Sequence, residues 1–150
     1  YNVVINKIIN DAINGKPLKL FNNKNSIRDY IFIDDVISAF LYAGSSKKVI
    51  TDGRYYLVGS GEGKSIEEVW KLIANRVKAV TGKNVAIEVD KTAKLEPIEM
   101  RNFVSDTSLF KKTGWEPNTF IDEGIDITIK SIMSVEKIYK ENKKEEIKLN

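Results

Sequence analysis

The feature that most constrains the fold is the alternation of short β-prone runs with longer segments of helical periodicity. Apolar residues recur every three or four positions in four segments, at 4–13, 35–45, 66–81 and 120–135. Short runs typical of strands lie between the helical segments, at 18–21, 28–33, 55–58 and 84–90. This alternation indicates an α/β fold. The strand runs are too few for a full doubly wound sheet, so we expect half of a larger architecture.

Particular residues mark where these elements begin and end. Ser65 and Glu68 have the spacing of a capping box before the third helical segment, and Gly82 follows its end. Asp34 is predicted to cap the second helix, with Asp35 in its first turn, where a negative charge is favourable. The remaining segments are predicted as two connections, at 46–53 and 91–100, a short extended piece at 102–106 and one short helix at 106–114.

Composition excludes several kinds of site. The 150-residue chain has no His, so a Ser-His-Asp triad, a His general base and a His-rich metal site are impossible within it. It has no Cys either, which excludes disulfides and thiol catalysis and is typical of a reducing compartment. No apolar run is long enough for a membrane helix, and no signal peptide is visible. We expect a cytoplasmic protein without a membrane partner.

The charge pattern argues against nucleic-acid binding. The net charge is only +3, and much of the Lys lies in the tail of residues 136–150, where it alternates with Glu. Such a mixture is typical of a solvated helix face. The tail is therefore predicted as a charged helical extension, separate from a domain of residues 1–135.

The stretch VGSGEGKS resembles a phosphate-binding loop but has the wrong spacing. A P-loop needs G-x-x-x-x-G-K-[ST], so that consecutive backbone N–H groups surround a phosphate before the Lys reaches it. Counting back from Gly63 places Val58 where the first Gly belongs, and Gly59 is one residue too close. The glycines also fail the dinucleotide pattern G-x-G-x-x-G. The loop is better interpreted as a tight turn between a strand and a capped helix.

Two other patterns are weak candidates for chemistry. Tyr139 and Lys143 have the Y-x-x-x-K spacing of reductase active sites, but they lie in the charged tail. Asp34 and Asp35 are better explained as a helix start than as metal ligands, and no metal site is predicted.

Four units in order resemble one enzyme family. The segment IRDYIFIDDVISAFLYA is similar to a hallmark of the extended short-chain dehydrogenase/reductase family, the NAD-dependent epimerases and dehydratases of nucleotide sugars. INGKPLKLF, YYLVGSGEGKSIEEVWKLI and MRNFVSDTSLFKKTGWEPNTFIDEGI resemble further units of that family, over nearly residues 3–130.

The resemblance covers only the C-terminal, substrate-binding part of such an enzyme. It implies a small mixed α/β lobe whose Rossmann half is absent, and whose partners are that half and a nucleotide-diphosphate sugar. NAD or NADP would be held mainly by the Rossmann half, and this chain alone is expected to bind none. The intact enzyme would act by transient hydride transfer at a sugar carbon and could be a homodimer. No catalytic residue is assigned within the chain.

The resemblance also implies substrate-binding residues. Arg28 and Arg101 match positions at which the family binds the substrate pyrophosphate, an anion that suits a guanidinium fork. A surface ion pair is the alternative for Arg28. The segment Pro17, Leu18, Lys19, Leu20 and Phe21 resembles the one beside the nucleotide base, where backbone groups read the base edge and Phe21 packs on it. Core packing is the alternative for the two leucine side chains.

Other matched residues are expected to be structural. Asp35 is expected to stabilise its helix and the neighbouring turn, Trp115 and Pro117 to anchor the last helix, and Val58 to pack. The turn NNKNS replaces a glycine-containing turn of the family, which leaves base and sugar contacts there open.

Two alternatives to the enzyme remain. One is a non-catalytic nucleotide-sugar-binding or regulatory module without a cofactor domain, and the other is a small nucleotide-triphosphate-binding protein that uses residues 59–65. The sequence names neither the base nor the sugar.

Overall fold

A computed structural model describes residues 4–47 and 53–148 of the chain, so most of the loop predicted at 46–53 and the last two residues of the predicted tail lie outside the described residues. The helices are α1 (Val4–Ile13), α2 (Ile33–Ser45), α4 (Ile66–Thr81), α5 (Ser108–Lys111) and α6 (Ile121–Lys148), with a short 3₁₀ turn, η1 (Pro97–Met100). The strands are β1 (Leu18–Leu20), β2 (Ile27–Asp29), β3 (Gly63–Ser65) and β4 (Ile87–Val89).

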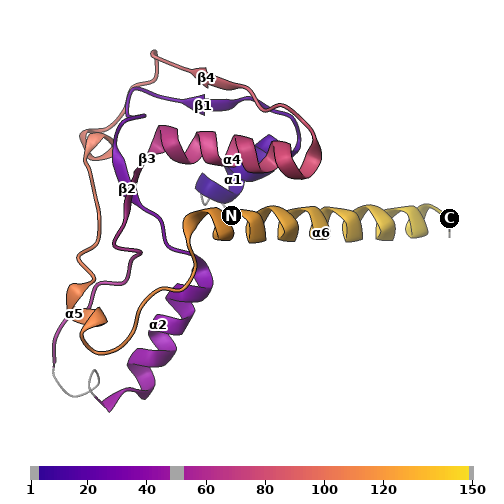
Figure 1. The fold of residues 1–150 in the computed structure, drawn as a ribbon. Helices are drawn as coiled ribbons and strands as arrows, with labels where there is room; N and C mark the ends of the chain where they lie inside the picture. Colours follow the sequence, from indigo (N-terminus) through magenta and orange to yellow (C-terminus); the bar gives the residue numbers. More distant parts are fainter. Residues whose placement is uncertain (1–3, 48–52, 149–150) are drawn as a thin grey trace.

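The strands pair in two small sheets. Strand β1 pairs with β4 in parallel, and β2 pairs with β3 in antiparallel register, Arg28 lying opposite Lys64. Figure 1 shows the β1–β4 pair above α4, with β2 and β3 descending from it towards α2. The mixed α/β lobe predicted from the sequence is therefore confirmed.

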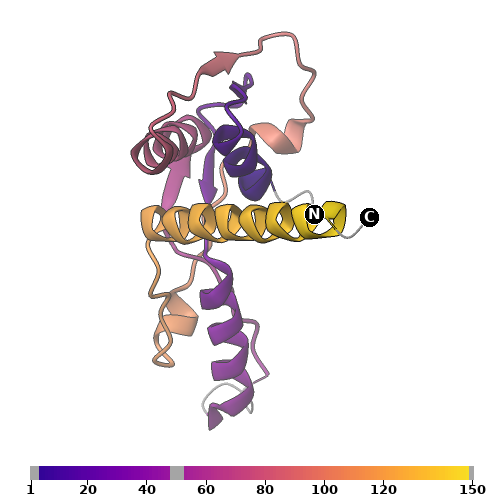
Figure 2. The same ribbon diagram turned by 90° about the vertical axis from the view of Figure 1, so that its right-hand side faces the viewer.

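The main core lies where α1, α4 and α6 meet β1. Helix α4 contributes Val69, Ile73 and Val77, all with no exposed surface, at the helical spacing expected from the sequence. Ile9 of α1 and Ile129 of α6 are also fully buried against them. Figure 2 shows α6 crossing this body and continuing to its C-terminal end. These helices fix the position of β1.

A second core, separate from the first, joins α2 to α5. Its buried residues are Ala39, Phe110 and Trp115, and the rings of the last two stack with centroids 4.9 Å apart. The Trp115 indole N–H donates to the Ser38 hydroxyl at 3.0 Å, which satisfies its one polar atom. Trp115 therefore anchors the connection before α6 onto α2.

The predicted element boundaries were partly right. The capping box of Ser65 and Glu68 is formed, and Gly82 ends α4 with a left-handed φ of 72°. Asp34 as the cap of α2 is wrong, because the helix begins at Ile33 after Phe32, which makes no side-chain cap bond. Asp35 does lie in the first turn.

Two strand predictions were wrong in extent or place. The strand predicted at 28–33 ends at Asp29, since α2 begins only a few residues later. The run at 55–58 belongs to no strand, and the chain instead pairs at Gly63–Ser65, inside the glycine-rich stretch. A close approach explains this shift: a Cβ on Gly63 would lie 2.5 Å from the Ile27 side chain. Only a glycine lets β3 approach β2 so closely.

Asp35 connects α2 to the start of α6. Its side chain is buried, and its carboxylate accepts hydrogen bonds from the backbone N–H groups of Asn118 (2.9 Å) and Thr119 (3.0 Å). These bonds hold the turn that leads into α6, as expected for a carboxylate that stabilises a helix and its neighbouring turn.

Asp29 connects three segments of the chain. It accepts hydrogen bonds from the Ser60 N–H (2.8 Å) and hydroxyl (2.5 Å), from the Gly61 N–H (3.2 Å) and from the Ser105 N–H (3.0 Å). Burial acts to raise the pKa of Asp29, but the bonds from Ser60, Ser105 and Gly61 outweigh it and hold the pKa below its ordinary value. Gly59 leaves room for this arrangement, because a Cβ there would lie 2.5 Å from Ser105.

The two adjacent aspartates of α2 provide a matched test of the Asp35 connection. We expect Asp35→Ala to lower the free energy of unfolding by about 2–4 kcal/mol, since two backbone donors lose a charged acceptor. Asp34→Ala removes an exposed carboxylate of the same helix turn and should cost at most about 1 kcal/mol. Urea unfolding followed by circular dichroism measures both. Equal losses would contradict the structural role of Asp35.

The lowered pKa of Asp29 makes a prediction about acid stability. Because the folded pKa lies below the unfolded one, the carboxylate stabilises the fold above the unfolded pKa, ordinarily near 3.8, and this stabilisation is lost as the pH falls through the folded pKa. Asp29→Asn should therefore cost about 1–3 kcal/mol at pH 7 and progressively less below about pH 4. Urea titrations at several pH values test this. Glu62→Gln, at a nearby exposed carboxylate, is the control, and a difference between Asp29→Asn and the parent that stays constant with pH would contradict it.

Candidate functional site

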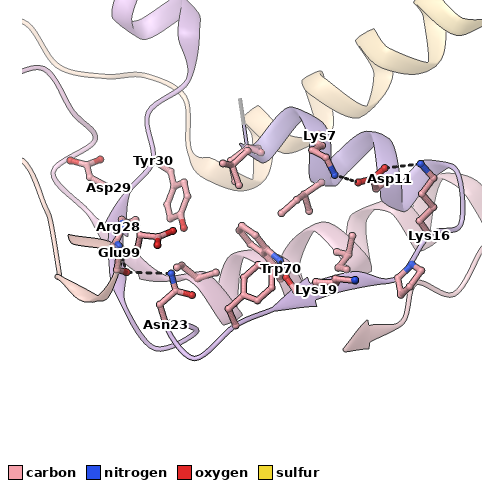
Figure 3. A pocket seen from close by; sticks show the side chains of 17 residues that line it. Lys7, Asp11, Lys16, Lys19, Asn23, Arg28, Asp29, Tyr30, Trp70 and Glu99 are labelled. Atoms are coloured by element: carbon pink, nitrogen blue, oxygen red, sulfur yellow. Dashed lines mark hydrogen bonds and ion pairs between the residues drawn. The ribbon is translucent and has the colours of Figure 1, made fainter. Parts of the chain in front are cut away.

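A cavity lies between α1, β1, β2 and α4. Its volume is about 990 Å³, within the size range of small-molecule sites. Figure 3 shows charged residues of α1 at one end and Arg28, Glu99 and Asn23 at the other, with Trp70 between them. Its lining residues are Val4, Ile5, Lys7, Ile8, Asp11, Lys16, Pro17, Leu18, Lys19, Phe21, Asn23, Arg28, Asp29, Tyr30, Ile66, Trp70 and Glu99.

Most of the segment predicted to lie beside the base borders this cavity. Pro17, Leu18, Lys19 and Phe21 are among its lining residues. Leu20 is not, and it is 1% exposed in the main core. Leu18 is equally buried. Both leucine side chains therefore pack in the core, which was the alternative to a binding role.

One edge of β1 is turned towards the cavity. Its other edge pairs with β4, as in the bond from the Leu18 N–H to the Ala86 carbonyl at 2.8 Å. On the cavity side, the Trp70 indole N–H donates to the Lys19 carbonyl at 2.9 Å. Backbone groups of alternate residues point to opposite edges of a strand, so the N–H and C=O groups of Lys19 point away from β4.

Aromatic rings from three elements line the same cavity. Phe21 follows β1, Tyr30 follows β2, and Trp70 lies on α4. Burial raises the pKa of the Tyr30 hydroxyl, although the positive charge of Arg28 acts in the opposite direction. Sequence reasoning missed Tyr30 and Trp70 as site residues. The helical periodicity assigned Trp70 to the core, and it is in fact both 6% exposed and a lining residue.

Arg28 lies at the other end and joins the cavity to a second segment. Its guanidinium donates to the carbonyls of Glu99 (2.7 Å), Ile27 (2.9 Å) and Arg101. A guanidinium has five N–H donors. The three bonds leave donors for a further anion, and the ion pair considered for Arg28 is not among the described salt bridges.

The segment at 97–102, here called the strap, is held by its backbone. Besides Arg28, the Asn23 amide donates to the Glu99 carbonyl at 3.2 Å, and the Ser26 hydroxyl donates to the Met100 carbonyl at 3.2 Å. Arg101 is exposed and is not a lining residue of the cavity. The structure thus connects the two predicted arginines through a backbone carbonyl, with Arg28 in the cavity wall and Arg101 outside it.

Charged residues of α1 and of the turn after it form the opposite end of the cavity. Asp11 lies between Lys7 (2.7 Å) and Lys16 (3.2 Å). The hydrogen bond from Lys7 is the main reason that the pKa of Asp11 is lowered, and Lys16 acts in the same direction. With Lys19, three Lys side chains border the cavity, so cations lie at both of its ends. Lys7 and Asp11 of α1 were not predicted as site residues, because i, i+4 charge pairs are typical of any solvated helix surface. Lys16, which follows α1, was not predicted either.

The glycine-rich loop binds an anion, but that anion is Asp29. The N–H groups of Ser60 and Gly61, which a phosphate would need, donate to its carboxylate. The loop therefore does not fit the phosphate of a nucleotide triphosphate or the pyrophosphate of a dinucleotide. Ser65 is occupied in the capping box.

Other candidate chemistry finds no support in the described part of the chain. No group of acidic side chains within residues 4–47 and 53–148 could hold a metal ion. Tyr139 and Lys143 are exposed on α6 and do not border the cavity. No helix of the described residues is long and apolar enough to span a bilayer.

Comparison with known proteins identifies relatives. A family model described as GDP-mannose 4,6 dehydratase matches residues 2–128. The dTDP-4-dehydro-6-deoxyglucose reductase of Escherichia coli is 29% identical over 136 residues, which cover 87% of this chain and 37% of the reductase. The UDP-glucose 4-epimerase of Mycolicibacterium smegmatis is 30% identical over 115 residues, or 77% of this chain and 34% of the epimerase. The chain spans little more than a third of the length of these relatives.

Solved structures show the same fold. The UDP-glucose 4-epimerase of Thermus thermophilus, solved in complex with NAD, has a TM-score of 0.64 and 25% identity, with coverage of 85% of this chain and 39% of the epimerase. The epimerase Mth375 of Methanothermobacter thermautotrophicus has a TM-score of 0.74 at 19% identity, with coverage of 94% and 40%. The chain belongs to the family of GDP-mannose 4,6 dehydratase and related nucleotide-sugar epimerases, dehydratases and reductases, and it matches their C-terminal part.

Proposed function

We propose that this chain is the nucleotide-sugar-binding part of an NAD(P)-dependent epimerase or dehydratase. The observation that carries the proposal is the cavity beside β1, which combines a strand edge, three aromatic rings and Arg28. A nucleoside diphosphate needs this set of groups: polar groups for the base edge, an aromatic face for stacking, and a cation for the pyrophosphate.

The base is assigned to the β1 side of the cavity. Peptide groups near Lys19 would bond its edge, and Phe21 would pack on its face. The remaining donors of Arg28 would bind the pyrophosphate. Arg101 would bind the pyrophosphate from outside the cavity wall. The hydrogen bond from the Arg28 guanidinium to the Arg101 backbone carbonyl sets the position of Arg101. Pro17 would contribute to the lining of the cavity. Leu18 and Leu20 would only hold Lys19 in place, since their side chains are core residues and their backbone groups bond to the β4 segment.

The cofactor is assigned to a separate half of the protein. The glycine-rich loop of this chain does not fit a dinucleotide, because Asp29 occupies its N–H groups. A Rossmann half would hold NAD or NADP, which supplies hydride transfer at a sugar carbon, and this chain would orient the sugar nucleotide towards it. The same proposal includes three further points. They are a division into a domain of residues 1–135 and a helical tail of residues 136–150, a cytoplasmic location, and a dimer of the intact enzyme.

Nucleotide binding by the 150-residue chain tests the proposal. In ¹⁵N NMR titrations with UDP-glucose, dTDP-glucose and GDP-mannose, we expect shifts for the amides of residues 18–21 with at least one of them, and no turnover. Arg101→Ala should weaken the binding of that nucleotide sugar about tenfold, because one charge-assisted contact is lost. It should leave the matching nucleoside, which has no phosphate, unaffected.

Lys130→Ala is the control for this titration. It removes one exposed positive charge from α6, away from the cavity. If Lys130→Ala and Arg101→Ala lower the affinity equally, the loss of affinity comes from overall charge. That result would contradict a contact between Arg101 and the pyrophosphate. Saturable turnover by this chain alone would contradict the assignment of the chemistry to a separate half.

A further inference from the structure

The turn after helix α1 contains a dipeptide with a chemistry of its own. Asn14 is followed by Gly15, and no other Asn of the 150-residue chain precedes a glycine. Both residues are exposed, and they lie in the connection from α1 to β1. Gly15 has a left-handed φ of 75°, and a Cβ added to it would meet nothing within 4 Å. The space beside this peptide group is therefore open.

An Asn side chain can react with the backbone nitrogen of the residue that follows it. The Gly15 nitrogen loses its proton to hydroxide and attacks the Asn14 Cγ, so that an N–Cγ bond forms and the Cγ–Nδ2 bond breaks. The side-chain nitrogen takes a proton from water and leaves as ammonia, and a cyclic imide remains. Water then opens the imide at one of its two carbonyls, which leaves aspartate or isoaspartate at position 14. A side chain on the following residue hinders the attack, and glycine has none.

The bonds that hold these two groups are those of an exposed helix end. The Gly15 N–H donates to the Ala12 carbonyl at 3.0 Å. The Asn14 side-chain amide donates to the Asn10 carbonyl at 2.9 Å and to the Glu136 carboxylate at 3.3 Å. The last turn of a helix opens at low free energy, because no further turn follows it. The attack therefore needs local opening of this turn and not unfolding of the core.

We propose that Asn14 is a self-modification site, which converts in the folded protein to aspartate and isoaspartate. Gly15 supplies the attacking nitrogen, and water is the only co-reactant. The inference goes beyond the proposed function and does not depend on it, because the reaction uses neither the cavity nor a nucleotide.

The product changes the contact between α1 and α6. A carboxylate at position 14 has no N–H to donate, so the bonds to Asn10 and Glu136 are lost. The new charge lies next to the Glu136 carboxylate, and like charges so close repel each other. It also lies at the C-terminal end of α1, where the helix dipole disfavours an anion. Isoaspartate further adds one methylene to the backbone that leads to β1. Conversion therefore loosens the attachment of α1 at this end.

Incubation of the folded chain in water enriched in heavy oxygen, followed by peptide mass spectrometry, tests the proposal. We expect position 14 to take up the label at least tenfold faster than Asn84, an exposed Asn that precedes Val85. The rate should rise with pH, because the attacking nitrogen must lose its proton. Both aspartate and isoaspartate should be found at position 14. Asn14→Gln, whose longer side chain must close a larger ring, is the matched control and should take up no label there.

Two further measurements can overturn the inference. If the urea-unfolded chain takes up the label at position 14 and the folded chain does not, the helix end protects Asn14 and the site does not exist in the folded protein. Equal rates at Asn14 and Asn84 would overturn it as well. In urea unfolding, Asn14→Asp should lower the folding equilibrium constant about two- to tenfold, and Asn84→Asp less than about twofold. If Asn14→Asp is as stable as the parent, the predicted effect on α1 is wrong.

Discussion

The site depends on the hydrogen bonds that the Asp29 carboxylate accepts. Asp29 lies at the end of β2. Its bonds to Ser60, Gly61 and Ser105 hold the glycine-rich loop and the segment at Ser105 next to this strand. These bonds fix the approach of the glycine-rich loop, and therefore the place at which β3 pairs with β2. Arg28 precedes Asp29 in the same strand. The positions of the guanidinium in the cavity wall and of the loop behind it are thus set by neighbouring residues of one short strand.

Sequence reasoning recovered the fold where local signals agree with tertiary packing. The helix of residues 66–81 was predicted almost to the residue, because an apolar stripe, a capping box and a terminal glycine all indicate the same element. It failed at 55–58 and at 63–65. There, propensity favours the aromatic run as a strand, but the actual pairing depends on the space between β2 and β3, which only glycine leaves.

The site could be predicted only in part, for a similar reason. Arg28 and the segment from Pro17 to Phe21 were found through a motif, and all of them except Leu20 border the cavity. Tyr30, Trp70 and the charged residues of α1 come from elements far apart in the sequence. Their side chains meet only because α1 and α4 pack against β1, and no local pattern contains that information. The spacing argument against a phosphate loop was right, but the anion inside it became visible only in the fold.

The position of Arg28 has a thermodynamic consequence. One guanidinium bonds the strap and borders the cavity, so a ligand that contacts it interacts with a group whose orientation the strap already restricts. Ligand affinity and strap stability are then linked, and the linkage is reciprocal. If a ligand binds more tightly when Arg28 is bonded to the strap, it stabilises these bonds by the same free energy by which they raise its affinity. The 97–102 segment, in which Glu99 borders the cavity, would therefore influence binding through its bonds to Arg28.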